Sequence, residues 1–199
     1  MFVKNFINNN RGEAYAAEVA NRLDYLKHTK FIEDLYNELV VKFPYSSYVK
    51  NVGLKLIRYK VLALGKEAPE MVMQNIDEQN IRLSDQRGKY TLVFFTVNYD
   101  TRSHEMATKL KSFYHQFNSR NFEVYNVVMD ESKDEWRSYL DTTQAPWIVV
   151  SDILGAKSTA LDYYLAPTYP MTYLIDPNGI LIQKYVNMDE LEKLLLANK

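Results

Sequence analysis

The chain has 199 residues, no cysteine and a formal net charge of −1, which suits one domain of ordinary size with a small addition. Because no basic block stands out and no apolar run approaches the roughly 20 residues that span a bilayer, we expect neither nucleic-acid binding nor a membrane span. The absence of cysteine excludes disulfide exchange, peroxide reduction through a sulfenic acid and attack by a thiolate.

The first part of the chain is predicted to be helical. Apolar residues recur at spacings of three and four through residues 13–62, as amphipathic helices require. The pair Phe43-Pro44 interrupts the pattern, because proline disfavours a helical conformation in its predecessor, and Ser47 is a good cap for a helix over 47–62. The apolar stripes need a covering surface. We favour packing within the chain; a homo-oligomer or partner interface through residues 13–62 is the alternative.

A change of pattern marks a second section. At Leu64-Gly65-Lys66 helical spacing gives way to short apolar runs, which predicts a helical section at 1–64 and an α/β section at 65–199. The strongest strand of the second section is 90–97, since a continuous β-branched and aromatic run is typical of a strand covered on both faces.

The second section alternates strands with helices. A helix at 103–117 and a strand at 122–129 follow the central strand as a βαβ unit, and Pro177-Asn178-Gly179 forms the turn of an antiparallel hairpin. The remaining expected elements are strands at 71–75, 81–83, 147–150, 172–176 and 180–185, and helices that begin near 130–134 or cover 157–164 and 190–198. This order predicts an α/β fold, a mixed β-sheet with helices on both faces.

Four separated stretches of the second section form a recognisable set. They are GKEAP at 65–69, IRLSDQRGKYTLVFF at 81–95, WIVVSD at 147–152 and YPMTYLIDPNG at 169–179. With them the chain, from about Gly65 to its end, resembles the TlpA-like and AhpC/TSA-like branch of the thioredoxin superfamily, which contains bacterial thiol-disulfide oxidoreductases. The resemblance implies a thioredoxin-like mixed β-sheet flanked by helices, with the N-terminal helical section as an addition.

The resemblance also locates the missing cysteines. Aligning Glu105-Met106 with the Glu-Met that commonly follows the family's cysteine pair places Tyr99 and Arg102 at the two cysteine positions, with Asp100-Thr101 between them. Val93 occupies the place where many thioredoxins bury an acid that assists proton transfer. Both the nucleophile and the proton relay are therefore replaced, which implies a redox-inactive member of the family.

Binding needs no sulfur, and the resemblance implies where it would occur. The family's cysteine pair lies at a helix N-terminus, where backbone N–H groups and the helix dipole stabilise an anion. The bond before Pro170 is expected to be cis, and in the family an extended peptide pairs with the backbone beside this proline. The candidate binding residues are Tyr99, Asp100, Thr101, Arg102, Tyr169, Pro170 and Met171.

Two features of this candidate site leave alternatives open. Arg102 is either a solvated or Asp100-paired side chain, which we favour, or it helps to bind a carboxylate or phosphate. The resemblance places Tyr169-Pro170 opposite Tyr99, so the two rings form either an aromatic platform or a plug that fills the groove. We favour a filled groove.

Other chemistries receive little support. Asp100, Ser103 and His104 contain the residue types of a hydrolytic triad, but neighbouring helical residues point apart and no oxyanion turn is present. A metal needs three or four ligands, and His28 and His115 lie in separate predicted helices. We therefore expect no metal and no cofactor. The acidic run of Asp130, Glu131, Asp134 and Glu135 is interpreted as capping of the next helix.

The leading functional hypothesis is a redox-inactive thioredoxin-like protein that binds a peptide or partner protein at the former active site. The alternatives are a family-type oxidoreductase role that uses a partner's cysteines, and a structural module that works through its helical section. The opening MFVKNFINNN lacks the apolar core and cleavage site of a signal peptide. The bacterial periplasm or cell envelope is expected from the resemblance alone.

Overall fold

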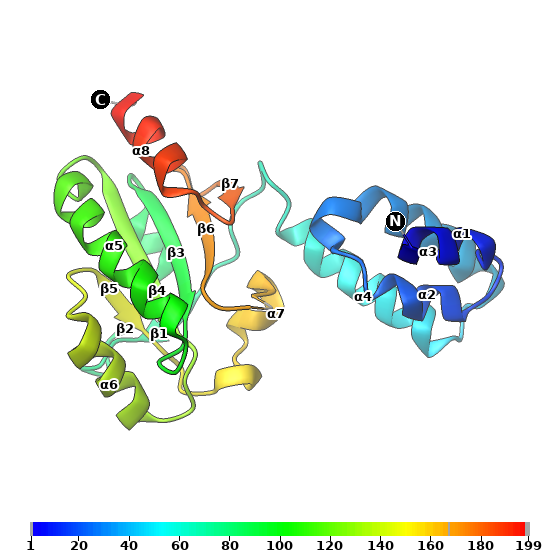
Figure 1. Cartoon of the computed structure of the whole chain (residues 1–199), viewed down its shortest axis with the longest axis horizontal. Coiled ribbons are helices and arrows are strands. Elements are labelled where there is room, and N and C mark those ends of the chain that lie inside the picture. Colours follow the sequence, from blue (N-terminus) through cyan, green and yellow to red (C-terminus); the bar gives the residue numbers. More distant parts are fainter. Residues whose placement is uncertain (1, 167, 198–199) are drawn as a thin grey trace. The chain divides into compact units, whose positions relative to one another are not determined.

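The computed structural model describes residues 2–166 and 168–197, apart from the side chain of Leu26. The chain divides into two units, Met1–Val61 and Leu62–Lys199 (Figure 1). Each unit has its own buried core. The division falls between 61 and 62 rather than between 64 and 65 as the sequence pattern predicts, because Leu62 is buried in the core of the second unit. No helix in the described part of the chain is both long and apolar enough to cross a bilayer.

The first unit consists of four helices in the part that the structure describes: α1 (Phe2–Asn9), α2 (Tyr15–Ala20), α3 (Tyr25–Lys42) and α4 (Ser47–Val61). Their apolar faces meet in one core, in which Ile7, Ile32 and Leu35 are fully buried. The start of α4 at Ser47 is confirmed. The sequence pattern missed α1 and the break between α2 and α3. The helix α3 is kinked at His28, where φ is −127°, which lies between the two apolar stripes at 16–26 and 31–43.

The second unit contains a five-stranded mixed sheet in the order β5-β4-β3-β6-β7. The central strand β3 pairs in parallel with β4 and antiparallel with β6, which confirms the predicted α/β fold and the closing hairpin. A separate antiparallel pair is formed by β1 and β2. The strands are β1 (Val72–Gln74), β2 (Asn80–Arg82), β3 (Tyr90–Thr96), β4 (Phe122–Val128), β5 (Ile148–Val150), β6 (Met171–Ile175) and β7 (Leu181–Lys184).

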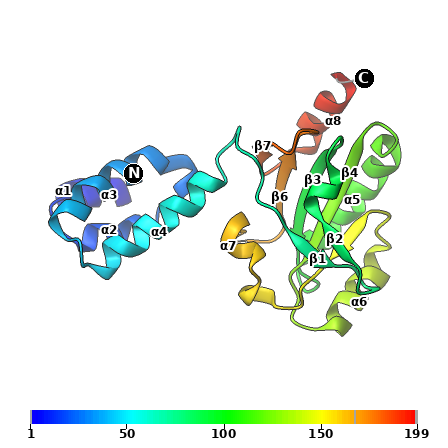
Figure 2. The same ribbon diagram turned by 180° about the vertical axis from the view of Figure 1, so that it is seen from behind.

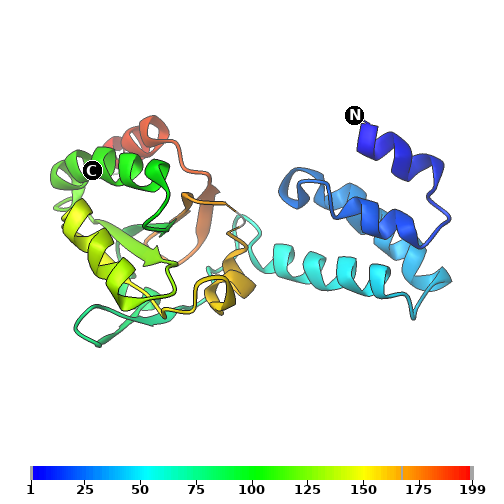
Figure 3. The ribbon, with the colours of Figure 1, turned by 60° about the horizontal axis from the view of Figure 1, so that its bottom comes forward.

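Both faces of the sheet are covered, because alternate residues of β3 enter different cores. Leu92 and Phe94 pack beneath α5 (Thr101–Phe117), α6 (Lys133–Thr143) and α8 (Met188–Ala197). Val93 and Phe95 pack on the other face, where α7 (Ala160–Tyr164) lies. Figure 2 shows α7, β1 and β2 from behind, and Figure 3 shows α5 and α8 on the opposite side of the sheet. Two short 3₁₀ helices, η1 (Leu83–Gln86) and η2 (Gly155–Lys157), connect these elements. Residue 198 of the predicted last helix lies outside the described residues.

This topology brings three chain segments to one edge of the sheet. The parallel strands β3 and β4 end together, with Thr96 opposite Val128, and β6 starts there, with Met171 opposite Phe95. The turn into α5, the loop after β4 and the loop before β6 therefore meet at the carboxyl end of β3, which is where ligands commonly bind in open α/β sheets.

Candidate functional site

The turn between β3 and α5 is organised by Asp100. Its backbone is extended (φ −94°, ψ 111°), and its Oδ2 accepts hydrogen bonds from Ser103 N at 3.1 Å and from Ser103 Oγ at 3.0 Å. Such an N-cap satisfies an N–H group that has no partner within the helix. The helix consequently begins at Thr101 rather than at 103, the start that the apolar spacing predicts.

Arg102 in the first turn of α5 is paired locally. Its Nε donates a hydrogen bond to Asp100 Oδ1 at 3.1 Å, and 70% of its side chain is exposed. Burial raises the pKa of the Asp100 carboxyl, but hydrogen bonds from Arg102 and Ser103 outweigh burial and hold this pKa below its usual value. The favoured interpretation, an Asp-paired arginine, agrees with this geometry.

Tyr99 and Tyr169 line one cavity of about 240 Å³ at the edge of the sheet. Tyr169 is half-buried, and burial together with the proximity of Tyr99 and Asp130 raises the pKa of its phenol. Tyr99 is 80% exposed. The favoured expectation of a groove filled by both rings is therefore wrong for Tyr99, whose ring lies mostly in solvent. The other lining residues are Val97, Met129, Asp130, Glu131, Glu135 and Ala156.

The remaining predicted site residues do not line this cavity. Thr101 is exposed on the first turn of α5, and Pro170 follows Tyr169 through a cis peptide bond, the isomer that the resemblance implies. Met171 is only 1% exposed and belongs to the core beneath the sheet, while its backbone pairs with Phe95. The side chain of Met171 therefore packs in the core and is not accessible to a ligand.

Asp130 is a site residue that the sequence interpretation missed. It follows β4, is 3% exposed, and accepts hydrogen bonds from the backbone N–H of Asn98 at 3.0 Å through each carboxylate oxygen. It does not cap the next helix, so that prediction is wrong for this residue. Burial raises the pKa of the Asp130 carboxyl, although the Asn98 hydrogen bond partly opposes the shift. Its position directly after a buried parallel strand was the signal that could have identified it.

The rest of the acidic run divides between capping and the cavity. Ser132 is the N-cap of α6: its Oγ accepts from Glu135 N at 3.2 Å and donates to Glu135 Oε2 at 2.9 Å. Asp134 and Glu135 lie in the first turn, where their charge complements the helix dipole. Glu131 lines the cavity and lies against Gly155, where an added Cβ would come within 2.4 Å of Glu131 Cγ.

The geometry gives no support to a hydrolytic triad. The Oγ of Ser103 donates to Asp100, whereas His104 Nε2 donates to the backbone carbonyl of Asn98 at 2.6 Å. Serine and histidine therefore have separate partners, and both hold the turn around Tyr99 in place. Within residues 2–166 and 168–197, no group of three His, Asp or Glu side chains is placed to hold a metal ion.

The cavity is suited to binding rather than to thiol chemistry. Its lining includes three carboxylates and two phenols, and it includes no basic side chain. The walls can accept hydrogen bonds, attract positive charge and offer ring surface to an apolar or cationic group. The chain has no cysteine to act as a nucleophile.

Comparison with known proteins agrees with this description. The model of the AhpC/TSA family matches residues 64–184. The chain is similar to thiol-disulfide oxidoreductase ResA of Bacillus subtilis (strain 168), with 26% identity over 119 residues, which cover 60% of this chain and 65% of that protein. Its similarity to ResA of Bacillus cereus (strain ZK / E33L) is 22% over 133 residues, which cover 67% and 75% of the two chains. The match with the first relative thus spans just under two thirds of its length.

Solved structures establish the fold. The thioredoxin domain of a thiol-disulfide oxidoreductase from Bacteroides vulgatus superposes with a TM-score of 0.62 and 24% identity, over 68% of this chain and 96% of that one. A thiol-disulfide oxidoreductase from Bacteroides fragilis NCTC 9343 gives a TM-score of 0.61 and 21% identity, over 65% and 99% of the two chains. The second unit is therefore thioredoxin-like.

Proposed function

Because this chain belongs to the AhpC/TSA family, we propose that it is a redox-inactive thioredoxin-fold protein that binds an extended peptide segment of a partner protein at the former active site. The observation on which this rests is the cavity between Tyr99 and Tyr169. It lies where the resemblance places the cysteine pair, in a chain without cysteine. A fold can keep its concave site after it has lost the associated chemistry, because function resides in the site rather than in the fold.

In this proposal Tyr99 and Tyr169 supply ring surface to the peptide. The start of α5 borders the binding site with Asp100, Thr101 and Arg102. The backbone beside Pro170 offers hydrogen bonds to an extended segment, which is the mode of strand addition. Met171 serves as the buried anchor of that loop. Asp130 and its neighbours make the floor acidic.

Two measurements test the proposal. Purified full-length protein is expected not to accelerate the reduction of insulin or of peroxide with any reductant, and turnover by the pure protein would contradict redox inactivity. Turnover that appears only after a cysteine-containing partner is added would support the alternative of an oxidoreductase role shared with that partner.

Binding is tested with a photo-crosslinking residue. Placed at position 99 in cells, it should form an adduct with a partner protein, and the adduct should disappear in a Tyr169→Ala background. The matched control is position 45, where Tyr45 is 99% exposed in the helical unit. Equal adducts from positions 99 and 45 would rule out a specific site at the cavity.

A second candidate function is favoured by the surface of α4. Leu54, Ile57 and Val61 are 51%, 62% and 45% exposed, and their spacing of three and four places them on one face of the helix. We propose this face as an interaction surface of the helical unit, with a homo-oligomer as the simplest case. Light scattering over a range of protein concentrations tests this proposal. The wild type should form a dimer, and a Leu54→Gln/Ile57→Gln variant should stay monomeric. A wild type that is monomeric at every concentration would contradict the oligomer.

We propose a location in the bacterial cell envelope, on the basis of resemblance. The relatives and structures compared above come from species of Bacillus and Bacteroides. Immunodetection after fractionation of the source cells tests the location, and recovery in the cytosolic fraction alone would contradict it.

A further inference from the structure

The helix α4 has apolar residues on two sides. One side, which includes Val52 and Leu56, packs in the core of the helical unit. The other side carries the exposed Leu54, Ile57 and Val61, which form a stripe along one face of the helix. A helix that is apolar on one side only needs a single neighbour, whereas a second apolar side favours a second contact. The stripe is therefore a surface suited to a partner.

The charged residues of α4 are all cations. Its sequence, SYVKNVGLKLIRYKV, contains three lysines and one arginine and no aspartate or glutamate. Lys50 lies one turn before Leu54 and Arg58 one turn after it, so two exposed cations border the apolar stripe. Lys60 lies at the side of α3, where it pairs with Glu33 at 2.7 Å. A helical face that combines apolar and basic residues is typical of attachment to an anionic membrane surface.

The helical unit as a whole is positively charged. Residues 1–61 contain ten lysines and arginines and six aspartates and glutamates. Four of the six acidic residues already form ion pairs within the unit, and these are Asp24, Glu33, Asp34 and Glu38. The excess of positive charge attracts an anionic surface toward this unit.

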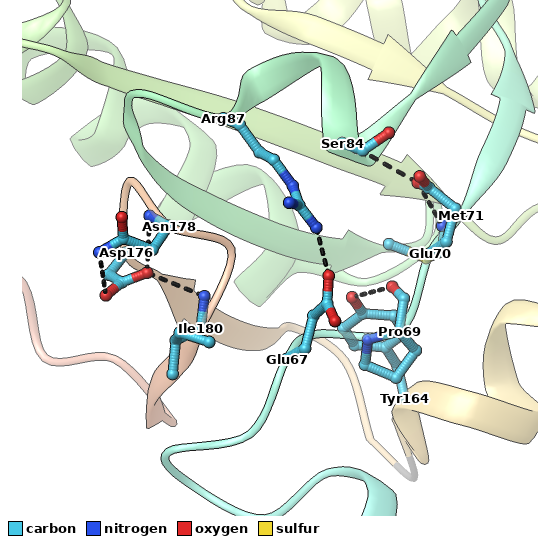
Figure 4. Close-up of polar contacts among 10 residues, drawn as sticks. All are labelled: Glu67, Pro69, Glu70, Met71, Ser84, Arg87, Tyr164, Asp176, Asn178 and Ile180. Atoms are coloured by element: carbon cyan, nitrogen blue, oxygen red, sulfur yellow. Dashed lines mark hydrogen bonds and ion pairs between the residues drawn. The ribbon is translucent and has the colours of Figure 1, made fainter.

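The chain segment that follows α4 is held by the second unit. Leu62 is buried in the core of that unit. Glu67 forms an ion pair with Arg87 (Figure 4). The hydroxyl of Tyr164 donates a hydrogen bond to the carbonyl of Pro69 at 2.6 Å. Because these contacts engage the segment, it is not available to cover the apolar stripe of α4.

We propose that the exposed stripe of α4 binds the surface of an anionic lipid bilayer. Leu54, Ile57 and Val61 enter the boundary between the headgroups and the acyl chains, and Lys50 and Arg58 contact the lipid phosphates. A second copy of the chain would bring the same cations together, whereas an anionic surface neutralises them. The inference rests on the proposal that this face is an interaction surface, and it is independent of the peptide site.

The test is sedimentation of the full-length protein with lipid vesicles. Vesicles of phosphatidylcholine with about one third phosphatidylglycerol should bind the protein saturably and about tenfold more tightly than vesicles of phosphatidylcholine alone. Because the chain has no cysteine, an environment-sensitive dye attached to Ile57→Cys reports on one position. Its emission should shift to shorter wavelength on the anionic vesicles as the dye leaves water.

Two double variants separate the charge from the apolar contact. Lys50→Gln/Arg58→Gln should weaken binding to the anionic vesicles about twentyfold, because each cation near an anionic surface contributes about fivefold. Leu54→Gln/Ile57→Gln should weaken binding about tenfold, because it removes apolar side chains from the lipid boundary.

Each double variant has a matched control in the second unit. Lys109→Gln/Arg137→Gln neutralises two exposed cations of α5 and α6. Leu154→Gln/Leu196→Gln replaces two leucines that are 47% and 41% exposed. Both controls should bind the vesicles as the wild type does, and circular dichroism reports whether each variant is folded. If a double variant of α4 does not fold, Lys50→Gln or Ile57→Gln alone takes its place.

Three outcomes with folded protein would overturn the proposal. They are equal binding to the two kinds of vesicle, emission of the dye at position 57 that does not shift, and wild-type affinity in either α4 variant. Light scattering without lipid distinguishes the two occupants of this face. A dimer that binds no vesicles assigns the stripe to a second copy, and a monomer that binds none contradicts both the bilayer and the oligomer.

Discussion

At the scale of single residues, Asp100 determines how α5 begins. Its carboxylate accepts hydrogen bonds from the backbone N–H of Ser103, the third residue of α5, and from the guanidinium of Arg102. One backbone N–H group of the first turn and the Arg102 guanidinium are thus paired with a carboxylate of the chain itself.

Asp100→Ala should destabilise the second unit by about 1 kcal/mol, the usual cost of a lost N-cap. Arg102→Gln is the control, since an exposed ion pair contributes only about 0–1 kcal/mol. Both tryptophans, Trp136 and Trp147, lie in the second unit, so urea unfolding followed by their fluorescence reports on it selectively. If Arg102→Gln lowers the free energy of unfolding as much as Asp100→Ala does, the ion pair rather than the N-cap is the source of the stability.

The buried Asp130 predicts a pH dependence. Because burial raises the pKa of this carboxyl above its unfolded value, the folded state binds the proton more tightly than the unfolded state does. Asp130 therefore lowers stability increasingly as the pH rises from the unfolded pKa, about 3.9, through the folded pKa. Asp130→Asn cannot ionise and can still accept from Asn98 N.

The free energy of unfolding of Asp130→Asn, relative to the wild type, should therefore increase between about pH 3.5 and pH 7. Urea titrations at both pH values measure the difference. A difference that is constant, or that changes in the opposite direction, would show that Asp130 is not penalised by burial.

At the scale of elements, the helical unit depends on the close approach of α3 and α4. A Cβ added at Gly53 would lie 2.7 Å from the ring of Tyr36, so any larger residue would force this ring to move, which favours glycine here although glycine disfavours helix. The sequence pattern shows the apolar stripe of each helix and not the distance between the helices.

Gly53→Ala should destabilise the helical unit by about 1–3 kcal/mol, because overpacking outweighs the gain in helix propensity of about 1 kcal/mol. In a Tyr36→Val background the same substitution should be neutral or stabilising, because the clash is gone. Far-ultraviolet circular dichroism in urea follows the helices, and an equal cost in both backgrounds would exclude the ring contact as the cause.

The loop between β4 and α6 gives the proposed peptide groove its charge. Since Asp130, Glu131 and Glu135 line the cavity with two tyrosines, a peptide with a central arginine should bind about fivefold more tightly than one with norleucine, from roughly 1 kcal/mol of charge and ring contact. Glutamate at the same position should bind more weakly than norleucine. Fluorescence anisotropy measures the series.

Glu131→Gln/Glu135→Gln should abolish most of this preference, while binding of the norleucine peptide stays unchanged. Affinities that do not depend on the central residue would mean that the cavity is not where the peptide lies. Absence of binding by every peptide would instead count against the groove itself.

At the scale of the whole molecule, the two units have separate cores, and the boundary between them has an energetic consequence. Leu62 is 1% exposed in the core of the second unit. A fragment of residues 62–199 should therefore unfold cooperatively, and it should be about 2 kcal/mol more stable than a fragment of residues 65–199, the cost of losing one fully buried leucine.

Urea unfolding by tryptophan fluorescence compares the two fragments. Equal stabilities would show that residues 62–64 are dispensable for the second unit, which would place the boundary where the sequence pattern puts it.

The sequence alone is sufficient for the fold class, whereas the position of the candidate site stays a prediction from the resemblance. The sequence predicts long periodic segments well. A strand buried on both faces, such as 90–97, is apolar throughout, and a helix buried on one face, such as 103–117, has apolar residues at spacings of three and four. Short elements were less well defined: α1 was missed, and the break between α2 and α3 was hidden by apolar residues that continue the same spacing. That the chain carries no thiol for disulfide exchange follows directly from the absence of cysteine.

The details of the site depend on contacts between residues far apart in the chain. The sequence predicts Asp130 to be a helix cap, but its carboxylate accepts hydrogen bonds from the backbone N–H of Asn98. The resemblance implies that Met171 takes part in binding, but its side chain is buried in the core. The burial and the hydrogen-bond partners of Asp130 and Met171 are set by the packing of β4 and β6 against β3. The local spacing of apolar residues does not indicate which strands will be neighbours. The exposure of Tyr99 at the edge of the cavity has the same origin.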